Sequence, residues 1–290
     1  MSAAPELKAL WEDPAFASRY RFAEVITGPY AKHLVEQARI ESTKERPLVI
    51  LDNACGTGVV ADKLQRLLDE EAKSNMQLTC ADISEVMLEI TKKRIQEEGW
   101  KNIETKIVDA QKTGLPSSHY SHVFASFVIM ALPEPDSALN ETLRILKPGG
   151  TIAFSTWKKS GWFSDLRDAI AEIPGNLPFP SQQEFLEAIG KGHWDDETWI
   201  AERLQDHGFE DISVRPVEES VTVDNHDDFI TMLSSMTPLI TSRFWSEEQK
   251  QTHEKDIAPV MRAYLERKYG KGQPIKTDWI AILSTAKKPM

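Results

Sequence analysis

Residues 48–64 read LVILDNACGTGVVADKL, a short apolar run followed by a turn with two glycines and then by a stretch with helical spacing. The run Leu48 to Leu51 is continuous and apolar, which is typical of a strand covered on both faces. Gly56 and Gly58 have no Cβ, so a ligand can approach the backbone closely at the turn. The helix that follows begins with N–H groups that lack backbone partners, and such a helix start favours polar ligands.

The same order of strand, loop and helix repeats along the next hundred residues. Strands are predicted at 48–52, 78–82, 104–108, 122–127 and 151–156, helices at 59–73, 84–99 and 136–146, and a turn at 147–150. Strands that alternate with helices at this spacing indicate a parallel sheet with right-handed crossovers. The sequence therefore predicts an α/β fold.

After Trp157 the pattern changes. Helices are predicted at 162–173 and 194–207, a strand at 212–223, two further helices within 224–269, and a closing strand at 279–286. An antiparallel pair of strands at the sheet edge, with helical insertions that form a lid, explains this order. The predicted division is an N-terminal helical cap at 1–46, a core at 47–157, and lid insertions with closing strands at 158–290.

Composition and charge exclude several classes of protein. The 290 residues are 41% hydrophobic and 27% charged, which suits one large globular domain or one domain with an appended lid. The net charge of −11 repels nucleic acid and anionic membranes. No apolar stretch is long enough for a membrane span, and the first residues lack the pattern of a signal peptide. Cys55 and Cys80 cannot form a disulfide framework and suit a reducing compartment. A cytoplasmic protein with a small-molecule partner is expected, and the oligomeric state stays open.

Acidic and polar residues close the predicted strands. Asp52, Asp82, Asp109 and Ser126 each lie at the carboxyl end of a strand, where parallel sheets bind their ligands. Asp82 is placed to accept hydrogen bonds from a ribose diol, and Asp109, followed by Ala110, from an exocyclic adenine amine. Alone, the glycine turn is a weak signal, since GxGxxA patterns also occur in nicotinamide-binding enzymes. Together these residues indicate a nucleoside site.

The motif series DNACGTG at 52–58, ADIS at 81–84, VDA at 108–110 and LKPGG at 146–150 resembles that of class I S-adenosylmethionine-dependent methyltransferases. This resemblance implies a Rossmann-like, seven-stranded, mostly parallel sheet, with S-adenosylmethionine as cofactor and S-adenosylhomocysteine as product. It places Gly56 and Gly58 against the methionine part of the cofactor, where Ala54 stands at a position that is usually glycine. It also implies that Asp82 holds the ribose, that the adjacent Ile83 contacts the cofactor, and that Asp109 with Ala110 holds the adenine.

A narrower resemblance covers most of the chain. RYRFAEVITGPYAKHLV at 19–35, LPFPSQQEF at 177–185 and GHWDDETW at 192–199 are similar to fungal methyltransferases of secondary metabolism, in particular the gliotoxin-type dithiol S-methyltransferases. The resemblance implies that Tyr20, Arg21 and Thr27 lie over the amino-acid end of the cofactor. It also implies transfer of a methyl group to a thiol of a small molecule.

Methyl transfer depends chiefly on alignment of the acceptor with the methyl group and on exclusion of water. A thiol needs no dedicated base, whereas an alcohol does. His193 is the candidate base by its neighbourhood, although a structural role suits it as well. An apolar acceptor pocket is predicted from five side chains, namely Phe127, Met130, Trp157, Trp162 and Phe179. No His and Cys group has the spacing of metal ligands.

Three alternatives stay open from the sequence. The acceptor atom is a thiol sulfur in the preferred interpretation, and an oxygen or nitrogen of a fungal metabolite otherwise. The glycine turn also fits an NAD-dependent oxidoreductase, although Asp109 and the LKPGG turn then have no role. A binding protein that kept the fold without catalysis is the third alternative.

Overall fold

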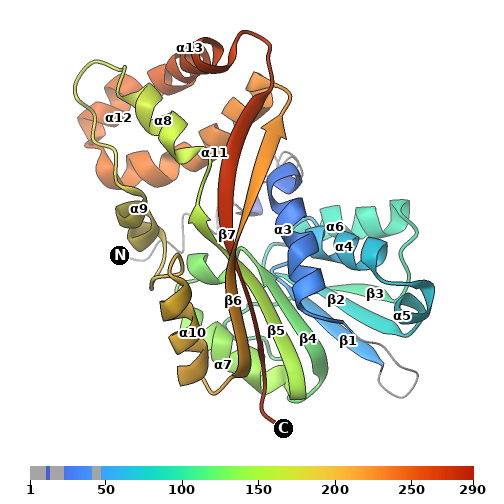
Figure 1. The fold of residues 1–290 in the computed structure, drawn as a ribbon. Helices are drawn as coiled ribbons and strands as arrows, with labels where there is room; N and C mark the ends of the chain where they lie inside the picture. The colour runs from blue at the N-terminus through green and yellow to red at the C-terminus, as the bar shows by residue number, and fades with distance from the viewer. Residues whose placement is uncertain (1–10, 14–22, 41–46) are drawn as a thin grey trace. The chain divides into compact units, whose positions relative to one another are not determined.

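The structure, a computed structural model, describes residues 11–13, 23–40 and 47–290. Its centre is a seven-stranded sheet with the order β3-β2-β1-β4-β5-β7-β6 (Figure 1). The strands are β1 Leu48–Asn53, β2 Met76–Asp82, β3 Ile103–Ile107, β4 Tyr120–Ser126, β5 Leu146–Lys159, β6 Glu210–Val223 and β7 Ile275–Lys287. The α-helices are α3 Glu24–Gln37, α4 Val59–Leu67, α5 Glu70–Ser74, α6 Glu85–Glu97, α7 Pro135–Ile145, α8 Phe163–Ile170, α9 Gln182–Ile189, α10 Glu197–Asp206, α11 His226–Phe244, α12 Glu247–His253 and α13 Ile257–Tyr269, and η2 Ile129–Ala131 and η3 Glu254–Asp256 are short 3₁₀ turns.

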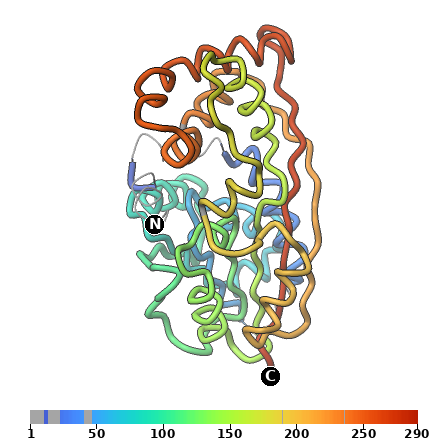
Figure 2. The backbone as a smooth tube through the Cα atoms, turned by 90° about the vertical axis from the view of Figure 1, so that its left-hand side faces the viewer, coloured from blue at the N-terminus to red at the C-terminus, as the bar shows by residue number. Residues whose placement is uncertain are grey.

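The first five strands are parallel. β1 pairs with β2 and with β4, β2 pairs with β3, and β4 pairs with β5, all in parallel register. The last two strands run antiparallel to each other, because Lys287 binds Asp211 at 2.6 Å while Ser220 binds Asp278 at 2.5 Å. Figure 2 shows β6 and β7 side by side along their length. The predicted Rossmann-like sheet of seven mostly parallel strands is confirmed.

Helices cover both faces of the parallel strands. Figure 1 shows α3, α4 and α6 on one side of these strands and α7 and α10 on the other. The latter pair is joined by Arg203, whose Nε donates to Asp136 at 2.9 Å. Between the layers, Leu51, Val123 and Phe154 are fully buried. Burial on both faces explains the continuous apolar run of β1, whereas the edge strand β3 is mostly exposed and carries Glu104 and Lys106.

The chain forms two compact units. The first comprises residues 1–158, 190–217 and 281–290, and the second comprises 159–189 and 218–280. In the second unit the buried carboxylate of Asp165 accepts a hydrogen bond from Tyr269 at 2.8 Å and pairs with Lys268. The division of the chain at residues 46 and 157 stays a prediction.

Local signals explain where the structure agrees with the sequence and where it differs. Ser84 caps α6 as predicted, since its side chain accepts from the N–H of Met87 at 3.2 Å. The single helix expected at 59–73 is wrong: Leu68 is extended, and Asp69 caps a second helix by accepting from Ala72 at 2.7 Å.

Two further expectations about loops are also wrong. The turn predicted at 147–150 belongs to β5, because Gly149 and Gly150 exchange backbone hydrogen bonds with Lys288 at 2.9 Å each. The two helices expected within 224–269 are three α-helices, since Ser246 and Gln249 form a capping box that starts α12.

Candidate functional site

The loop between β1 and α4 has an unusual backbone. Ala54, Gly56 and Gly58 adopt positive φ angles of 60°, 54° and 83°. The N–H of Cys55 donates to the carbonyl of Ala81 at 2.9 Å, which fixes the loop to β2. Gly58 is the N-cap of α4 and offers no side-chain cap, so the first N–H groups of that helix have no intrahelical partner. The N–H of Gly58 donates to the carbonyl of Cys55 at 2.9 Å, so the backbone donors offered at the carboxyl edge of the sheet are those at the start of α4.

Gly58 is required by both its backbone and its surroundings. A Cβ at this position would lie 3.3 Å from the methyl carbon of Thr91, in addition to the strain of φ 83°. The side chain of Thr91 is held in place, because its hydroxyl donates to the carbonyl of Gly56 at 2.7 Å. The close packing of the loop on α6 thus depends on the absence of a side chain.

Ala54 takes a left-handed conformation that L-residues other than glycine adopt at a cost. The variant Ala54→Gly is expected to raise the free energy of unfolding by about 0.5 kcal/mol, because relief of strain exceeds the added entropy of the unfolded chain. Urea denaturation would measure this change. A lower stability of the variant would show that packing of the Ala54 methyl group outweighs the strain.

Asp82 is the last residue of β2, and its side chain binds the glycine loop. Its Oδ2 accepts from the N–H of Gly56 and its Oδ1 from the N–H of Ser84, both at 2.9 Å. The side chain is buried, and burial raises the pKa of its carboxyl group. A carboxylate has about four lone-pair sites, so each oxygen keeps the capacity for a further donor.

Asp52 lies in β1 and is only 1% exposed. Among the described residues, neither of its carboxylate oxygens has a partner in hydrogen-bond geometry, and the nearby backbone N–H of Ala61 favours the ionised form only weakly. Burial, reinforced by the neighbouring carboxylate of Asp82, raises the pKa of Asp52 to about 8. An ionised carboxylate without a partner is costly in such a place, so the site is suited to a ligand that brings a positive charge.

The ends of β2 and β3 carry the residues expected around a nucleoside. Oδ1 of Asp109 accepts from the backbone N–H of Gln111 at 2.9 Å, which fixes the carboxylate at the start of the loop. Ala110 beside it is buried, whereas Ile83 is 42% exposed. An exposed isoleucine after a buried acid offers an apolar surface beside a polar one.

A cleft opens at the glycine loop and joins several of these elements. Of the residues expected from the sequence, the cleft brings together Thr27, Asp52, Ala54, Gly56, Ser126 and Phe127. It also includes residues that the sequence analysis missed, namely Glu24, Cys55, Thr57, Val59 and Val60. Cys55, Thr57, Val59 and Val60 are neighbours of the glycines in sequence, so loop position could have indicated them. Glu24 carries no such signal.

Phe127 closes one side of the cleft in a strained conformation. Its φ is 55°, and its N–H donates to the carbonyl of Ser155 at 3.0 Å. Ser126 before it shares a hydroxyl contact of 3.1 Å with Ser155. The Phe127 ring stacks on Trp157 at 3.9 Å, and Tyr30 meets both rings edge-on. Strain of about 1–3 kcal/mol is typically kept where a side chain must be aimed at a functional site.

Other expected residues are not among those that line this cleft. His193 is exposed and meets Trp199 edge-on at 5.8 Å, and Met130 is buried and accepts from the N–H of Trp157 at 3.3 Å. Trp162 and Phe179 pack around Phe163 in the second unit. Tyr20 and Arg21 lie outside the described residues.

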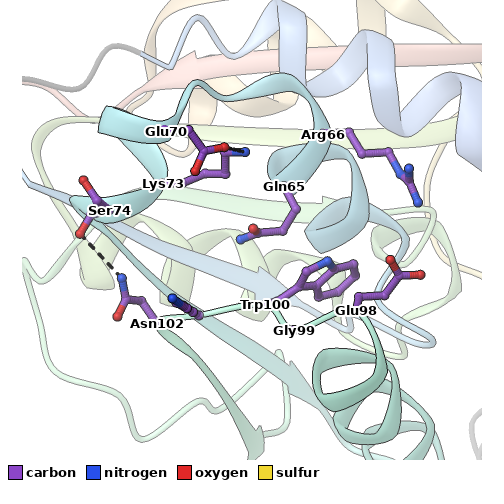
Figure 3. A pocket seen from close by; sticks show the side chains of 10 residues that line it. Gln65, Arg66, Glu70, Lys73, Ser74, Glu98, Gly99, Trp100 and Asn102 are labelled. Carbon is purple, nitrogen blue, oxygen red and sulfur yellow. Dashed lines mark hydrogen bonds and ion pairs between the residues drawn. The ribbon is translucent and has the colours of Figure 1, made fainter.

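A larger hollow of about 500 Å³ lies elsewhere, between the ends of α4 and α5 and the residues before β3 (Figure 3). Lys73 in its wall pairs with Glu70, and the carbonyl of Ser74 accepts from the side chain of Asn102 at 3.5 Å. Since these residues precede β2 and β3, the hollow is at the amino edge of the sheet, opposite the glycine loop. It contains none of the expected site residues.

Within the part of the chain that the structure describes, no group of three His, Cys, Asp or Glu side chains could hold a metal ion. No helix of residues 11–13, 23–40 and 47–290 has the length and apolar character needed to cross a membrane.

Comparison with known proteins gives consistent matches. Residues 50–150 match the family described as methyltransferase domain. The chain is 40% identical to Methyltransferase tpcH of Aspergillus fumigatus, over 98% of this chain and 100% of that protein. It is also 40% identical to the acetylaranotin bis-thiomethyltransferase of Aspergillus terreus, over 98% of each chain.

A solved structure shows the same fold. The phosphoethanolamine N-methyltransferase 2 of Haemonchus contortus superposes with a TM-score of 0.61 at 15% identity, covering 100% of this chain and 61% of that one. The family match and the two Aspergillus relatives favour methyl transfer over the dinucleotide-dependent alternative. The chain therefore belongs to the S-adenosylmethionine-dependent methyltransferases.

Proposed function

We propose that the protein transfers a methyl group from S-adenosylmethionine to a thiol of a dithiol-type fungal secondary metabolite, with S-adenosylhomocysteine as product. The observation that carries the cofactor assignment is the buried carboxylate of Asp52, which has no partner in hydrogen-bond geometry among the described residues and borders the glycine-loop cleft. The name of the Aspergillus terreus relative, a bis-thiomethyltransferase, supports the thiol acceptor.

Each expected cofactor contact has a place in this proposal. Asp52 faces the positively charged ammonium of the methionine part, and the backbone of Gly56 and Gly58 lies against that part. Asp82 receives the ribose hydroxyls beside Ile83, and Asp109 with Ala110 receives the adenine. Thr27 from α3 and Ser126 from β4 border the same cleft. Tyr20 and Arg21 are proposed to lie over the amino-acid end of the cofactor; both are outside the described residues.

When bound, the cofactor supplies a methyl group on a positively charged sulfur. The protein aligns an acceptor with that methyl group and keeps water away, which is catalysis by proximity. Phe127 and Trp157 form an apolar, stacked wall suited to both tasks. A thiol is partly ionised in solvent before it binds, so its proton is already in solvent and the reaction requires no base from the protein. His193, which does not line the cleft, is not needed for this acceptor.

The acceptor is a small molecule in this proposal, and Met130, Trp162 and Phe179 stay candidates for its binding. A reducing compartment such as the cytoplasm is proposed as the location, because Cys55 and Cys80 are both buried free thiols.

The test is a methyl-transfer screen with S-adenosylmethionine that carries a deuterated methyl group. Reduced dithiol, phenol and amine metabolites would be incubated with the protein, and mass spectrometry would locate the label. Labelled sulfur only in the dithiol series is the expected result. Label on a phenol or an amine, with none on sulfur, would assign the protein to O- or N-methyl transfer instead.

A further inference from the structure

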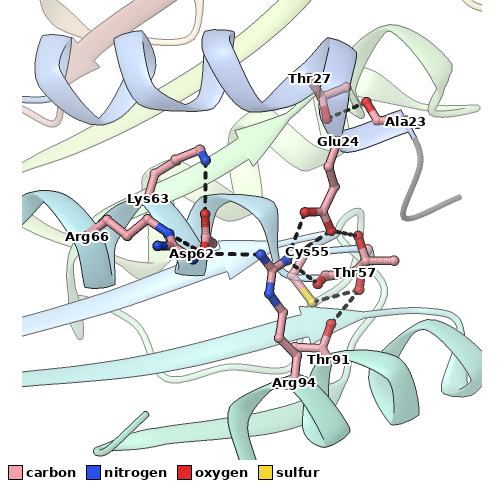
Figure 4. A network of polar contacts seen from close by, with 11 residues as sticks. Ala23, Glu24, Thr27, Cys55, Thr57, Asp62, Lys63, Arg66, Thr91 and Arg94 are labelled. Carbon is pink, nitrogen blue, oxygen red and sulfur yellow. Dashed lines mark hydrogen bonds and ion pairs between the residues drawn. The ribbon is translucent and has the colours of Figure 1, made fainter. Parts of the chain in front are cut away.

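A buried arginine behind the glycine loop has no role in the mechanism above. The side chain of Arg94, on α6, is 7% exposed. Its Nη1 donates to both oxygens of Glu24, at 2.9 and 3.0 Å, and its Nη2 pairs with Asp62 at 3.1 Å (Figure 4). These contacts join α6 to α3 and to α4 through a single cation.

The same guanidinium contacts the loop itself. Nη1 of Arg94 donates to the carbonyl of Thr57 at 3.2 Å, and the hydroxyl of Thr57 donates to Glu24 at 2.6 Å. Residue 57, between the two glycines, is thus held at its carbonyl by α6 and at its side chain by α3.

The carbonyl of the preceding residue, Gly56, is also bound from α6, by Thr91 at 2.7 Å. Two successive loop carbonyls therefore point toward α6. In a trans peptide the C=O and the N–H point in opposite directions, so the N–H of Thr57 is directed away from α6. The orientation of the Thr57 N–H is therefore set by a side chain of α6.

The two carboxylates that pair with Arg94 differ in the number of other cations around them. Asp62 has further cations within reach, Lys63 at 2.9 Å and Arg66 at 2.8 Å. Among the described residues, Arg94 is the cation that pairs with Glu24. Removal of Arg94 would leave Asp62 paired but would leave the carboxylate of Glu24, which borders the cleft, without its cation.

We propose that Arg94 is a positioning residue for cofactor binding: it fixes the Thr57 carbonyl and the Glu24 carboxylate so that the glycine loop and α3 form one rim of the cleft. This inference rests on the proposed function. Arg94 does not itself line the cleft. Its effect on the cofactor passes through Thr57 and Glu24, as outer contacts tune the ligands that they hold.

The first experiment is calorimetry with S-adenosylhomocysteine on the full chain. Arg94→Met is expected to weaken binding about 30-fold, as is typical when a residue that orients ligand-binding groups is lost. Arg66→Met is the matched control, because Arg66 pairs with the same Asp62 but has no contact with the loop or with α3 among those described. This control is expected to change the affinity less than about twofold. Arg94→Lys, which keeps a cation for Glu24, is expected to restore part of the affinity.

Hydrogen exchange separates positioning from a merely structural role. In the wild-type protein, saturating S-adenosylhomocysteine is expected to slow exchange in the glycine loop and in α3 together. In Arg94→Met the ligand is expected to protect the loop but not α3. If Arg94→Met fails to fold, Glu24→Gln, which removes the charge but keeps the shape, replaces it. In that variant too, the ligand is expected to protect the loop but not α3.

The outcomes distinguish the two proposals. Wild-type protein that does not bind S-adenosylhomocysteine would overturn the proposed function and this inference with it. Wild-type binding with unchanged affinity and unchanged protection of α3 in Arg94→Met would overturn the inference alone. Equal losses in Arg94→Met and Arg66→Met would also overturn it, since Asp62 rather than the loop would then carry the effect.

Discussion

Replacing Asp52 with asparagine is expected to weaken binding of S-adenosylhomocysteine about 100-fold while making the cofactor-free protein more stable. The loss of affinity follows because asparagine keeps the shape but not the charge that faces the ligand ammonium, a difference of about 3 kcal/mol for a buried charged contact. Calorimetry measures this loss. In the wild-type protein binding should also release a proton near neutral pH, detectable as a dependence of the measured heat on the buffer.

The gain in stability has a definite pH dependence. Burial raises the pKa of Asp52 to about 8 in the folded protein, against an ordinary value of 3.8. The folded state therefore binds this proton more tightly than the unfolded state, and the contribution of Asp52 to stability is present below pH 4 and lost as the pH rises to about 8. An asparagine in place of Asp52 does not titrate, so the free energy of unfolding of the variant lacks this fall between pH 4 and pH 8. Urea denaturation is expected to show a gain of about 2 kcal/mol for Asp52→Asn at pH 8, after allowance for an unpaired buried amide.

The control for this variant is Asp211→Asn, an exposed aspartate whose partner Lys287 keeps the pKa of its carboxyl below the ordinary value. It should change neither the affinity nor the slope between pH 4 and 8. An Asp52→Asn protein with unchanged affinity and lower stability would show that Asp52 serves the fold rather than the cofactor.

The second large effect is expected for Asp82→Ala, which should weaken S-adenosylhomocysteine binding by about 2 to 4 kcal/mol. Part of this loss is the hydrogen bonding of the ribose hydroxyls, about 1 to 3 kcal/mol. The remainder arises because the N–H groups of Gly56 and Ser84 lose their acceptor, so the loop is no longer held in place. Titration calorimetry gives the total.

A ligand without the 2′-hydroxyl separates the two parts. The wild-type protein is expected to bind 2′-deoxy-S-adenosylhomocysteine more weakly than S-adenosylhomocysteine, whereas Asp82→Ala should bind both about equally. If the variant still binds the ligand with the hydroxyl more tightly, Asp82 does not bind the ribose hydroxyl. Its role would then be only to bind the loop N–H groups.

Much of the parallel half of the fold could be predicted because its signals are local. The apolar run before Asp52, the two glycines and the Ser84 cap each act within a few residues. Where a local signal was weak, the prediction failed. The break between α4 and α5 depends on one capping side chain, Asp69, inside a stretch that keeps helical spacing.

The residues of the site also differ in whether the sequence alone could place them. Residues that follow the strands, such as Asp52 and Ser126, could be placed by topology, because parallel strands end at one edge of the sheet. The Glu24–Arg94 pair could not, since its members are far apart in sequence, and the stretch 19–35 that contains Glu24 gives no sign of a partner at Arg94. Their contact exists only because α3, α4 and α6 pack together, which is a property of the tertiary structure.

The position of β7 has a consequence for synthesis in the cell. Of the seven strands, β7 is the last to leave the ribosome, yet it lies between β5 and β6 in the sheet. Until it arrives, the nascent chain exposes the open edge of β5, the kind of surface on which strands of other chains pair. Completion of this sheet therefore waits for β7, and chaperone protection matters most until that strand has left the exit tunnel.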